Sequence, residues 1–121
     1  MKTTLVWSLA VLFAGTLFGS SSIAAETRCG WLQNPTPANW WLVDGDGRWT
    51  ISVQGGFQAA GMDNIPDLSQ GDYVTTNRSY GYACACLNVT ANPKTRRITQ
   101  IYRVKQQALR VCRQDPALPR E

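Results

Sequence analysis

The chain of 121 residues contains no histidine. Histidine is the side chain that changes its charge near neutral pH without tuning by its surroundings. Its absence excludes nucleophile systems that depend on a histidine base, and it excludes metal sites built on imidazole. The chain thus has no side chain that serves as a general acid or base near neutral pH without tuning, and carboxylate chemistry is what remains to be considered.

Carboxylates are also few, eight in the whole chain. Five of them lie in turn-forming segments of the first half of the domain: Asp44, Asp46, Asp63, Asp67 and Asp72. We interpret these five as solvated turn and loop residues. Residues 44–47, with the sequence DGDG, are not an EF-hand calcium loop, because Arg48 stands at the third acidic position and no glutamate follows at the required distance. The sequence thus predicts no catalytic residue, no metal site and no cofactor.

Internal repeats, low-complexity tracts and Gly/Ser linkers are absent from the sequence, which indicates one domain. The one long apolar run, residues 5–18, has 14 residues and is too short to span a bilayer of about 30 Å as a helix. Lys2 precedes this run and small residues follow it, which is the layout of a secretory signal peptide. We expect a signal peptide over residues 1–25, cleaved near Ala24 or Ala25, and a single exported domain over residues 26–121. The expected location is the periplasm, with no integral membrane anchor after cleavage.

Only four cysteines are present: Cys29, Cys84, Cys86 and Cys112. In a small exported domain, cysteines typically supplement a limited core as disulfides. Cys84 and Cys86 are separated by one residue of a predicted strand, so both sulfur atoms project from the same face. We expect each to pair with one of the two distant cysteines. The sequence leaves open whether Cys29 pairs with Cys84 or with Cys86.

The hydrophobic pattern predicts a mainly β (α+β) fold, a small antiparallel sheet of about four to five strands with a short C-terminal helix. Residues 39–53 have the pattern of a hairpin around the DGDG turn, with Leu42 opposite Trp49 and Trp40 opposite Ile51. Residues 80–90 and 96–104 read as a second antiparallel pair. Residues 105–114 favour a helix by propensity, and we expect the tail beyond Asp115 to be frayed.

Four of the five tryptophans lie between residues 31 and 49. Adjacent residues in a strand point to opposite faces, so Trp40 and Trp41 cannot both enter a one-sided core. We expect Trp40 to face the core, and Trp41 either to be exposed beside Arg48 or to be covered by another segment. Trp41 and Arg48 are therefore the predicted binding residues, suited to contact a sugar ring or a partner protein.

Positive and negative charges are segregated along the chain. Residues 26–77 carry two cations and six carboxylates, whereas residues 78–121 carry nine cations and two carboxylates. Within one fold the two sets either complement each other or are solvated. The partner that we expect is an envelope polymer or another protein rather than a nucleic acid, since no nucleic-acid-binding motif is present.

Several short motifs resemble those of an uncharacterised domain-of-unknown-function family of small exported bacterial proteins. They comprise Cys29-Gly30-Trp31-Leu32, the run from Asn34 to Leu42, Gln54-Gly55-Gly56, and Tyr80-Gly81-Tyr82-x-Cys84-x-Cys86-Leu87. The resemblance implies export and a single domain, and it transfers no site. Our functional expectation is a non-enzymatic periplasmic binding or inhibitory module of unknown ligand. The alternative is a thiol-redox or other small periplasmic enzyme acting through Cys84 and Cys86.

Overall fold

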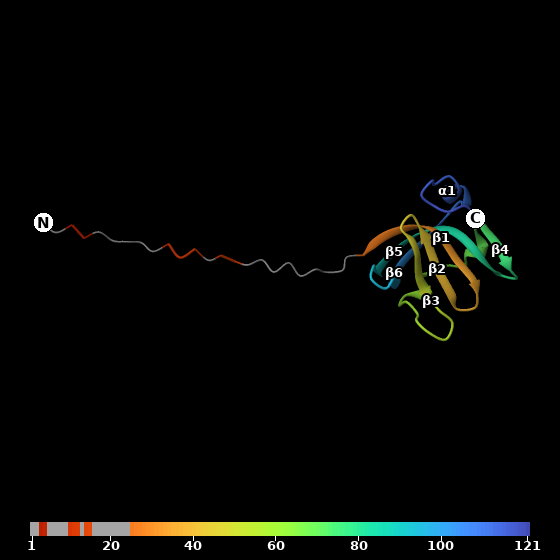
Figure 1. Cartoon of the computed structure of the whole chain (residues 1–121), viewed down its shortest axis with the longest axis horizontal. Helices are drawn as coiled ribbons and strands as arrows, with labels where there is room; N and C mark the ends of the chain where they lie inside the picture. Colours follow the sequence, from red (N-terminus) through yellow and green to blue (C-terminus); the bar gives the residue numbers. More distant parts are fainter. Residues whose placement is uncertain (1–2, 5–9, 13, 16–24) are drawn as a thin grey trace.

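The computed structural model describes residues 3–4, 10–12, 14–15 and 25–121 (Figure 1). Most of the expected signal peptide lies outside the described residues, as does Ala24. Among the residues that are described, no helix is both long and apolar enough to cross a membrane.

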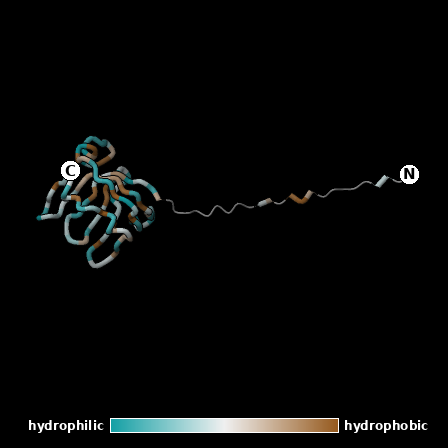
Figure 2. The backbone as a smooth tube through the Cα atoms, turned by 180° about the vertical axis from the view of Figure 1, so that it is seen from behind, coloured by the Kyte–Doolittle hydropathy of each residue, from teal (hydrophilic) through white to brown (hydrophobic). Residues whose placement is uncertain are grey.

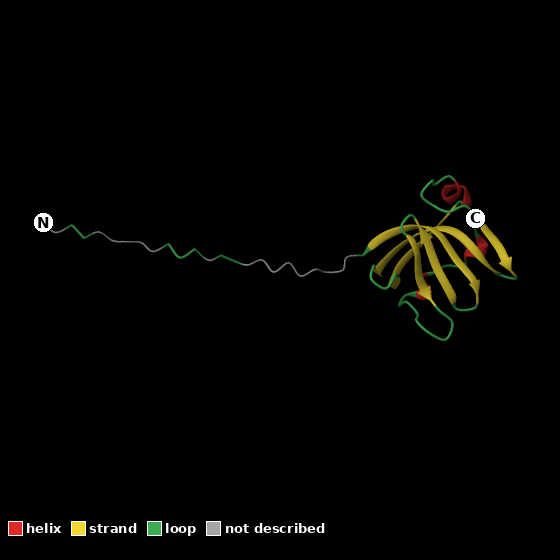
Figure 3. Cartoon of the chain, viewed as in Figure 1, coloured by secondary structure: helices red, strands yellow, loops and turns green. Residues whose placement is uncertain are grey.

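The domain is mainly β, which confirms the predicted fold class (Figure 3). Its elements are β1 (Glu26–Thr36), β2 (Asn39–Asp44), β3 (Gly47–Ser52), η1 (Met62–Asn64), η2 (Leu68–Gln70), β4 (Tyr73–Asn77), β5 (Tyr80–Asn92), β6 (Arg97–Gln107) and α1 (Leu109–Arg113). The sheet has six strands, one more than the upper figure that we expected.

Five strands form a closed ring in the order β1-β2-β3-β6-β5, because β5 also pairs with β1. Each of these pairings is antiparallel except β3 with β6, which run parallel. β4 lies outside the ring and pairs with the same edge of β5 as β6 does. β4 pairs with the start of β5, and β6 pairs with the rest of that strand. Tyr73 of β4 is opposite Ala83, and Gln107 of β6 is opposite the next residue, Cys84. The result is a small barrel with one appended strand.

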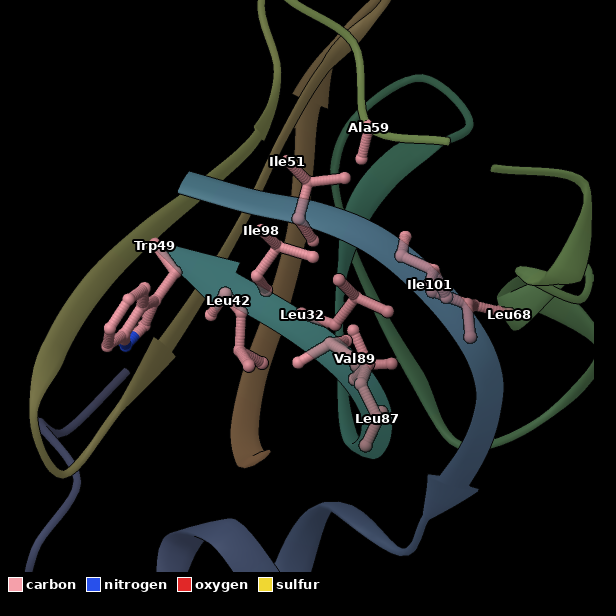
Figure 4. Packing of buried hydrophobic residues seen from close by; sticks show 13 residues of the cluster. Leu32, Leu42, Trp49, Ile51, Ala59, Leu68, Leu87, Val89, Ile98 and Ile101 are labelled. Carbon is pink, nitrogen blue, oxygen red and sulfur yellow. The ribbon is translucent and has the colours of Figure 1, made fainter. Parts of the chain in front are cut away.

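The barrel interior holds the main hydrophobic core (Figure 4). Along β5 every second side chain points inward, from Ala83 to Ala91, as a strand with one core face requires. Apolar and polar stretches alternate along the chain throughout the domain (Figure 2). Side chains from β1, β2, β3 and β6 complete this core: Leu32, Leu42, Trp49, Ile51, Ile98 and Ile101.

A second cluster lies on the outer face of β1 and β5, beneath α1. It consists of Trp31, Cys84, Leu109 and Cys112. α1 has only five residues, so the predicted helix over residues 105–114 is wrong in its first part. Lys105 to Gln107 instead continue β6, because they pair with residues 84–86 of β5, and that pairing overrides their helix propensity.

The first hairpin forms around the predicted turn, and Leu42 lies opposite Trp49 as expected. The predicted pairing of Trp40 with Ile51 is wrong. A register shift between Trp40 and Trp41 places Trp40 opposite Ser52. Such bulges add a residue to one strand and cannot be read from alternation alone.

Two disulfides are present, Cys29–Cys86 and Cys84–Cys112. They resolve the connectivity that the sequence left open. Cys29 and Cys86 are directly opposite each other in the β1–β5 ladder, whereas Cys84 reaches α1. The predicted attachment of both ends of the domain to one central strand is thus confirmed.

Candidate ligand-binding groove

A groove of about 320 Å³ opens at one end of the barrel. It lies where the end of β1 and the starts of β2, β4 and β5 meet the loop that carries η2. Residues from these separate segments line it: Asn34, Trp40, Pro66, Asp67, Leu68, Ser69, Tyr73, Ser79 and Tyr80. Concave sites of this size, with aromatic walls and a few polar groups, are typical of small-ligand binding.

Three half-buried aromatic rings form the walls, those of Trp40, Tyr73 and Tyr80. Trp40 and Tyr73 pack on the barrel core, which limits their movement. The Tyr73 hydroxyl also donates a hydrogen bond of 3.0 Å to the carbonyl oxygen of Ser79. These contacts hold the rings in place, so a ligand meets surfaces that are already ordered.

Asp67 is the one charged side chain among the lining residues. It caps η2: its Oδ1 accepts hydrogen bonds from the backbone N–H of Ser69 at 3.1 Å and from the Ser69 hydroxyl at 2.6 Å. These bonds lower the pKa of Asp67 below its ordinary value. Burial and the nearby negative charge of Asp67 in turn raise the pKa of Tyr73. The groove therefore holds one fixed carboxylate beside a neutral phenol at neutral pH.

The predicted binding residues, Trp41 and Arg48, lie together but not in this groove. They occupy neighbouring strands, and the Arg48 guanidinium carbon stacks 3.6 Å from the centre of the Trp41 ring. Trp41 is half-buried, and its indole nitrogen donates to Gln33 Oε1 at 2.5 Å. One ring face and the polar edge of Trp41 are thus occupied within the protein, and its binding role stays a prediction.

The DGDG turn contains an unexpected buried carboxylate. Asp44 is only 7% exposed, so its expected solvation is wrong, whereas Asp46 is exposed as predicted. Asp44 accepts hydrogen bonds from Arg28 Nη1 at 2.9 Å, from the Trp49 indole at 3.1 Å and from the Asp46 backbone N–H at 2.9 Å. Asp44 is therefore a structural residue of the hairpin.

Arg28 connects this turn to β1. Its guanidinium stacks 3.8 Å from the centre of the Trp49 ring and forms ion pairs with Glu26, Asp44 and Asp46. Burial disfavours the charged form of Arg28, but the hydrogen bonds to Asp44 and Asp46 and the neighbouring negative charges outweigh it, so its pKa is raised. Arg28 remains a cation at any physiological pH.

The cysteines that could form a redox pair belong to different disulfides. Cys84 is bonded to Cys112 and Cys86 to Cys29, and both bonds lie on the outer face, away from the groove-lining residues. Tyr82 packs over the Cys84–Cys112 cluster and meets the Trp31 ring edge-on at 5.4 Å. A dithiol of Cys84 and Cys86 forms only when both disulfides are opened.

A larger cavity, about 610 Å³, lies under the C-terminal segment and is lined by Trp31 and residues 113–116 and 118–121. The tail that encloses it is not frayed, contrary to expectation. The Trp31 indole donates to the Pro119 carbonyl at 3.0 Å, and Leu118 packs on the outer cluster. The tail therefore completes the cover over Trp31, which is fully buried.

Within residues 25–121 and the other described positions, no group of three or more His, Cys, Asp and Glu side chains gathers as a metal site would require. Most of the groove was missed from the sequence because its lining is brought together only by the barrel. One local signal was available. Asp67 followed by Ser69 is the pattern of a capped turn, and it fixes a carboxylate in the loop.

Comparison with known proteins gives a family without an assigned activity. No curated protein matches the chain, and no solved structure matches it. One family model matches residues 23–119, which include every strand, both disulfides and all residues of the groove. The chain therefore belongs to the family described as Protein of unknown function (DUF4087).

Proposed function

We propose that the protein is a non-enzymatic binding module of the bacterial periplasm and that its ligand occupies the aromatic groove at the end of the barrel. The observation that carries this proposal is that Trp40, Tyr73 and Tyr80 line one groove together with Asp67. Aromatic rings held by a core, with one oriented polar group, favour capture of a ligand rather than acid-base chemistry.

Export of this module is supported by two features. The disulfides Cys29–Cys86 and Cys84–Cys112 are of the kind that persists in oxidising compartments. The N-terminal sequence has the charged, apolar and small-residue regions of a signal peptide. The proposed sequence of events is export, cleavage near Ala24 or Ala25, oxidation of the four cysteines and then ligand binding.

NMR mapping on the ¹⁵N-labelled protein tests the location of the site. We would titrate it separately with a guanidinium salt, a neutral disaccharide and inorganic phosphate, and follow every backbone amide. The proposal predicts that at least one probe shifts amides of residues 67–69 and 79–81 together with the Trp40 indole signal. Shifts confined to Trp41 and Arg48, or no shifts with any probe, would contradict it.

A matched pair of substitutions completes this test. Trp40→Ala removes a groove wall, whereas Trp41→Ala removes the adjacent indole from the other face of the same strand. We expect the first to abolish the shifts and the second to leave them in place. The opposite pattern would move the site to Trp41 and Arg48.

A further inference from the structure

Six side chains of the groove carry donor hydrogens, and three of them have already used these hydrogens inside the protein. The Asn34 amide donates both of its N–H bonds, to the carbonyl oxygens of Thr36 at 2.9 Å and Asn39 at 2.8 Å. Only the Oδ1 atom of Asn34 is therefore left for a ligand, and it is an acceptor.

Two hydroxyls of the groove are committed in the same way. The Ser69 hydroxyl donates to Asp67, and the Tyr73 hydroxyl donates to the Ser79 carbonyl. A hydroxyl has one hydrogen, so both oxygens can now only accept. The hydroxyls of Ser79 and Tyr80 can act in either direction, and the indole N–H of Trp40 can only donate. The groove therefore keeps some donors, while Asn34, Ser69 and Tyr73 present only acceptor oxygens.

The charge of the groove also favours a ligand that donates hydrogen bonds, because it is negative. Asp67 is ionised at neutral pH, and no cation lines the groove to offset it. Its Oδ1 is occupied by Ser69, but Oδ2 has only a long contact of 3.4 Å from Gln70. Asp67 is exposed at the edge of the groove, so a charged acceptor with spare capacity lies beside the three aromatic rings. Aromatic faces attract cations through their quadrupoles.

The free edge of β4 suggests that the group bound in the groove is a side chain of an extended peptide. Among the described strands β4 pairs only with β5, and its first residue, Tyr73, is part of the groove wall. The unpaired edge of a strand is a template to which an extended peptide can add by backbone hydrogen bonds. A peptide on this edge would run beside the groove and could place one side chain into it.

We infer that the groove binds the cationic side chain of an arginine or lysine in an extended segment of a protein partner. This inference rests on the proposed function and names the chemistry of its ligand. Guanidinium and ammonium groups are donors without acceptors, which complements the Asp67 carboxylate and the acceptor oxygens of Asn34, Ser69 and Tyr73. An anion would be repelled by Asp67, and a neutral saccharide would gain no attraction between opposite charges.

Calorimetric titration with an acetylated and amidated pentapeptide, arginine at its centre and alanine elsewhere, tests the inference. The comparison peptide carries citrulline, which keeps the shape of arginine but lacks its charge. We expect the citrulline peptide to bind at least about tenfold more weakly, the scale of one charge-assisted hydrogen bond at a partly exposed site. Equal affinity of the two peptides would overturn the inference.

Asp67→Asn removes the charge and keeps a side chain that caps a turn equally well. It should weaken binding of the arginine peptide by about tenfold while leaving the citrulline peptide unchanged. Trp41→Ala is the control outside the groove and should leave both affinities unchanged. If Asp67→Asn has no effect on either peptide, the carboxylate does not recognise the ligand and the inference is wrong.

Further probes separate failure of this inference from failure of the proposed function. A neutral disaccharide that binds the groove more tightly than the peptide would refute the cationic ligand and retain a binding module. Free arginine amide that binds as tightly as the pentapeptide would refute the peptide carrier. If none of these probes shifts the groove amides, both proposals fail.

Discussion

Asp44 and Arg28 form a partly buried ion pair that links β1 to the first hairpin. Asp44 is buried and satisfies three donors, from β1, from β3 and from the turn between β2 and β3. When one partner of a buried hydrogen bond is removed, the group that is left unpaired keeps the full free-energy cost of its desolvation. The hairpin β2–β3 should therefore depend strongly on this one carboxylate.

The substitution Asp44→Ala should lower the free energy of unfolding by about 2–4 kcal/mol, because it leaves the Trp49 indole and the Arg28 guanidinium without their buried acceptor. Asp46→Ala is the matched control on the exposed side of the same turn, and it should cost less than about 1 kcal/mol. Urea unfolding monitored by tryptophan fluorescence measures both values. Similar losses for the two variants would show that Asp44 does not have the structural role that we assign to it.

The lowered pKa of Asp67 predicts how the affinity for the ligand depends on pH. Its pKa lies below the ordinary value, so the carboxylate stays charged as the pH falls through the range in which a free aspartate would be protonated. With no histidine in the chain, affinity for the arginine peptide should be constant from about pH 8 to about pH 5 and decline only in stronger acid. Calorimetry across this range tests the prediction. A fall in affinity between pH 7 and pH 5 would require a different group.

At the scale of elements, the position of β4 depends on Gly81. A Cβ atom at Gly81 would lie 1.8 Å from the carbonyl oxygen of Val74, so β4 can approach β5 this closely only because residue 81 has no side chain. The close approach also positions Tyr73 and Tyr80, which flank the groove.

Gly81→Ala should displace β4 from β5, lower the stability by about 1–3 kcal/mol and weaken ligand binding, since both tyrosines would move. Gly56→Ala is the control, because its added Cβ meets atoms no closer than 3.8 Å. Thermal unfolding and peptide titration of both variants check this. Unchanged binding in Gly81→Ala would show that β4 does not organise the groove.

The two disulfides differ in access to solvent. Cys29 is exposed and Cys86 half-buried, whereas Cys84 and Cys112 are 1% and 3% exposed beneath α1. A reductant attacks a sulfur atom directly, so access controls the rate. Mild reduction followed by alkylation and peptide mapping should label Cys29 and Cys86 first. Earlier labelling of Cys84 and Cys112 would indicate that α1 opens more readily than the packed structure implies.

Local signals in the sequence were enough to predict most elements but not their exact registers. The DGDG turn and the alternation in Trp49–Ile51 predicted the first hairpin because turn chemistry and side-chain period are local properties. The bulge at Trp40 and Trp41, and the continuation of β6 through Lys105, depend on partner strands far along the chain. The sequence near those residues does not contain that information.

For the whole molecule, closure of the barrel creates the candidate site. Asn34, Trp40, Asp67 and Tyr80 come from four segments that meet only when β5 pairs with β1. Trp41 and Arg48, the pair predicted from sequence, were identified from a local pattern. In the structure their side chains stack on each other outside the groove. Exposure of a single indole is a weaker indicator of a site than convergence of several rings.

The segregated charges remain largely solvated in the folded domain. In the part of the chain that the structure describes, the three ion pairs all involve Arg28 and carboxylates of residues 26–46. The nine cations of residues 78–121 form none of these pairs. The acidic half supplies the carboxylate of the groove, while the basic half gives the domain its net positive charge.

A crystal structure of the protein in complex with the arginine pentapeptide tests the central claim most directly. The account predicts that the guanidinium group lies against the rings of Trp40 and Tyr80, within hydrogen-bonding distance of Asp67, with the peptide backbone along β4. A peptide bound over Trp41 and Arg48, or under the C-terminal tail beside Trp31, would contradict it.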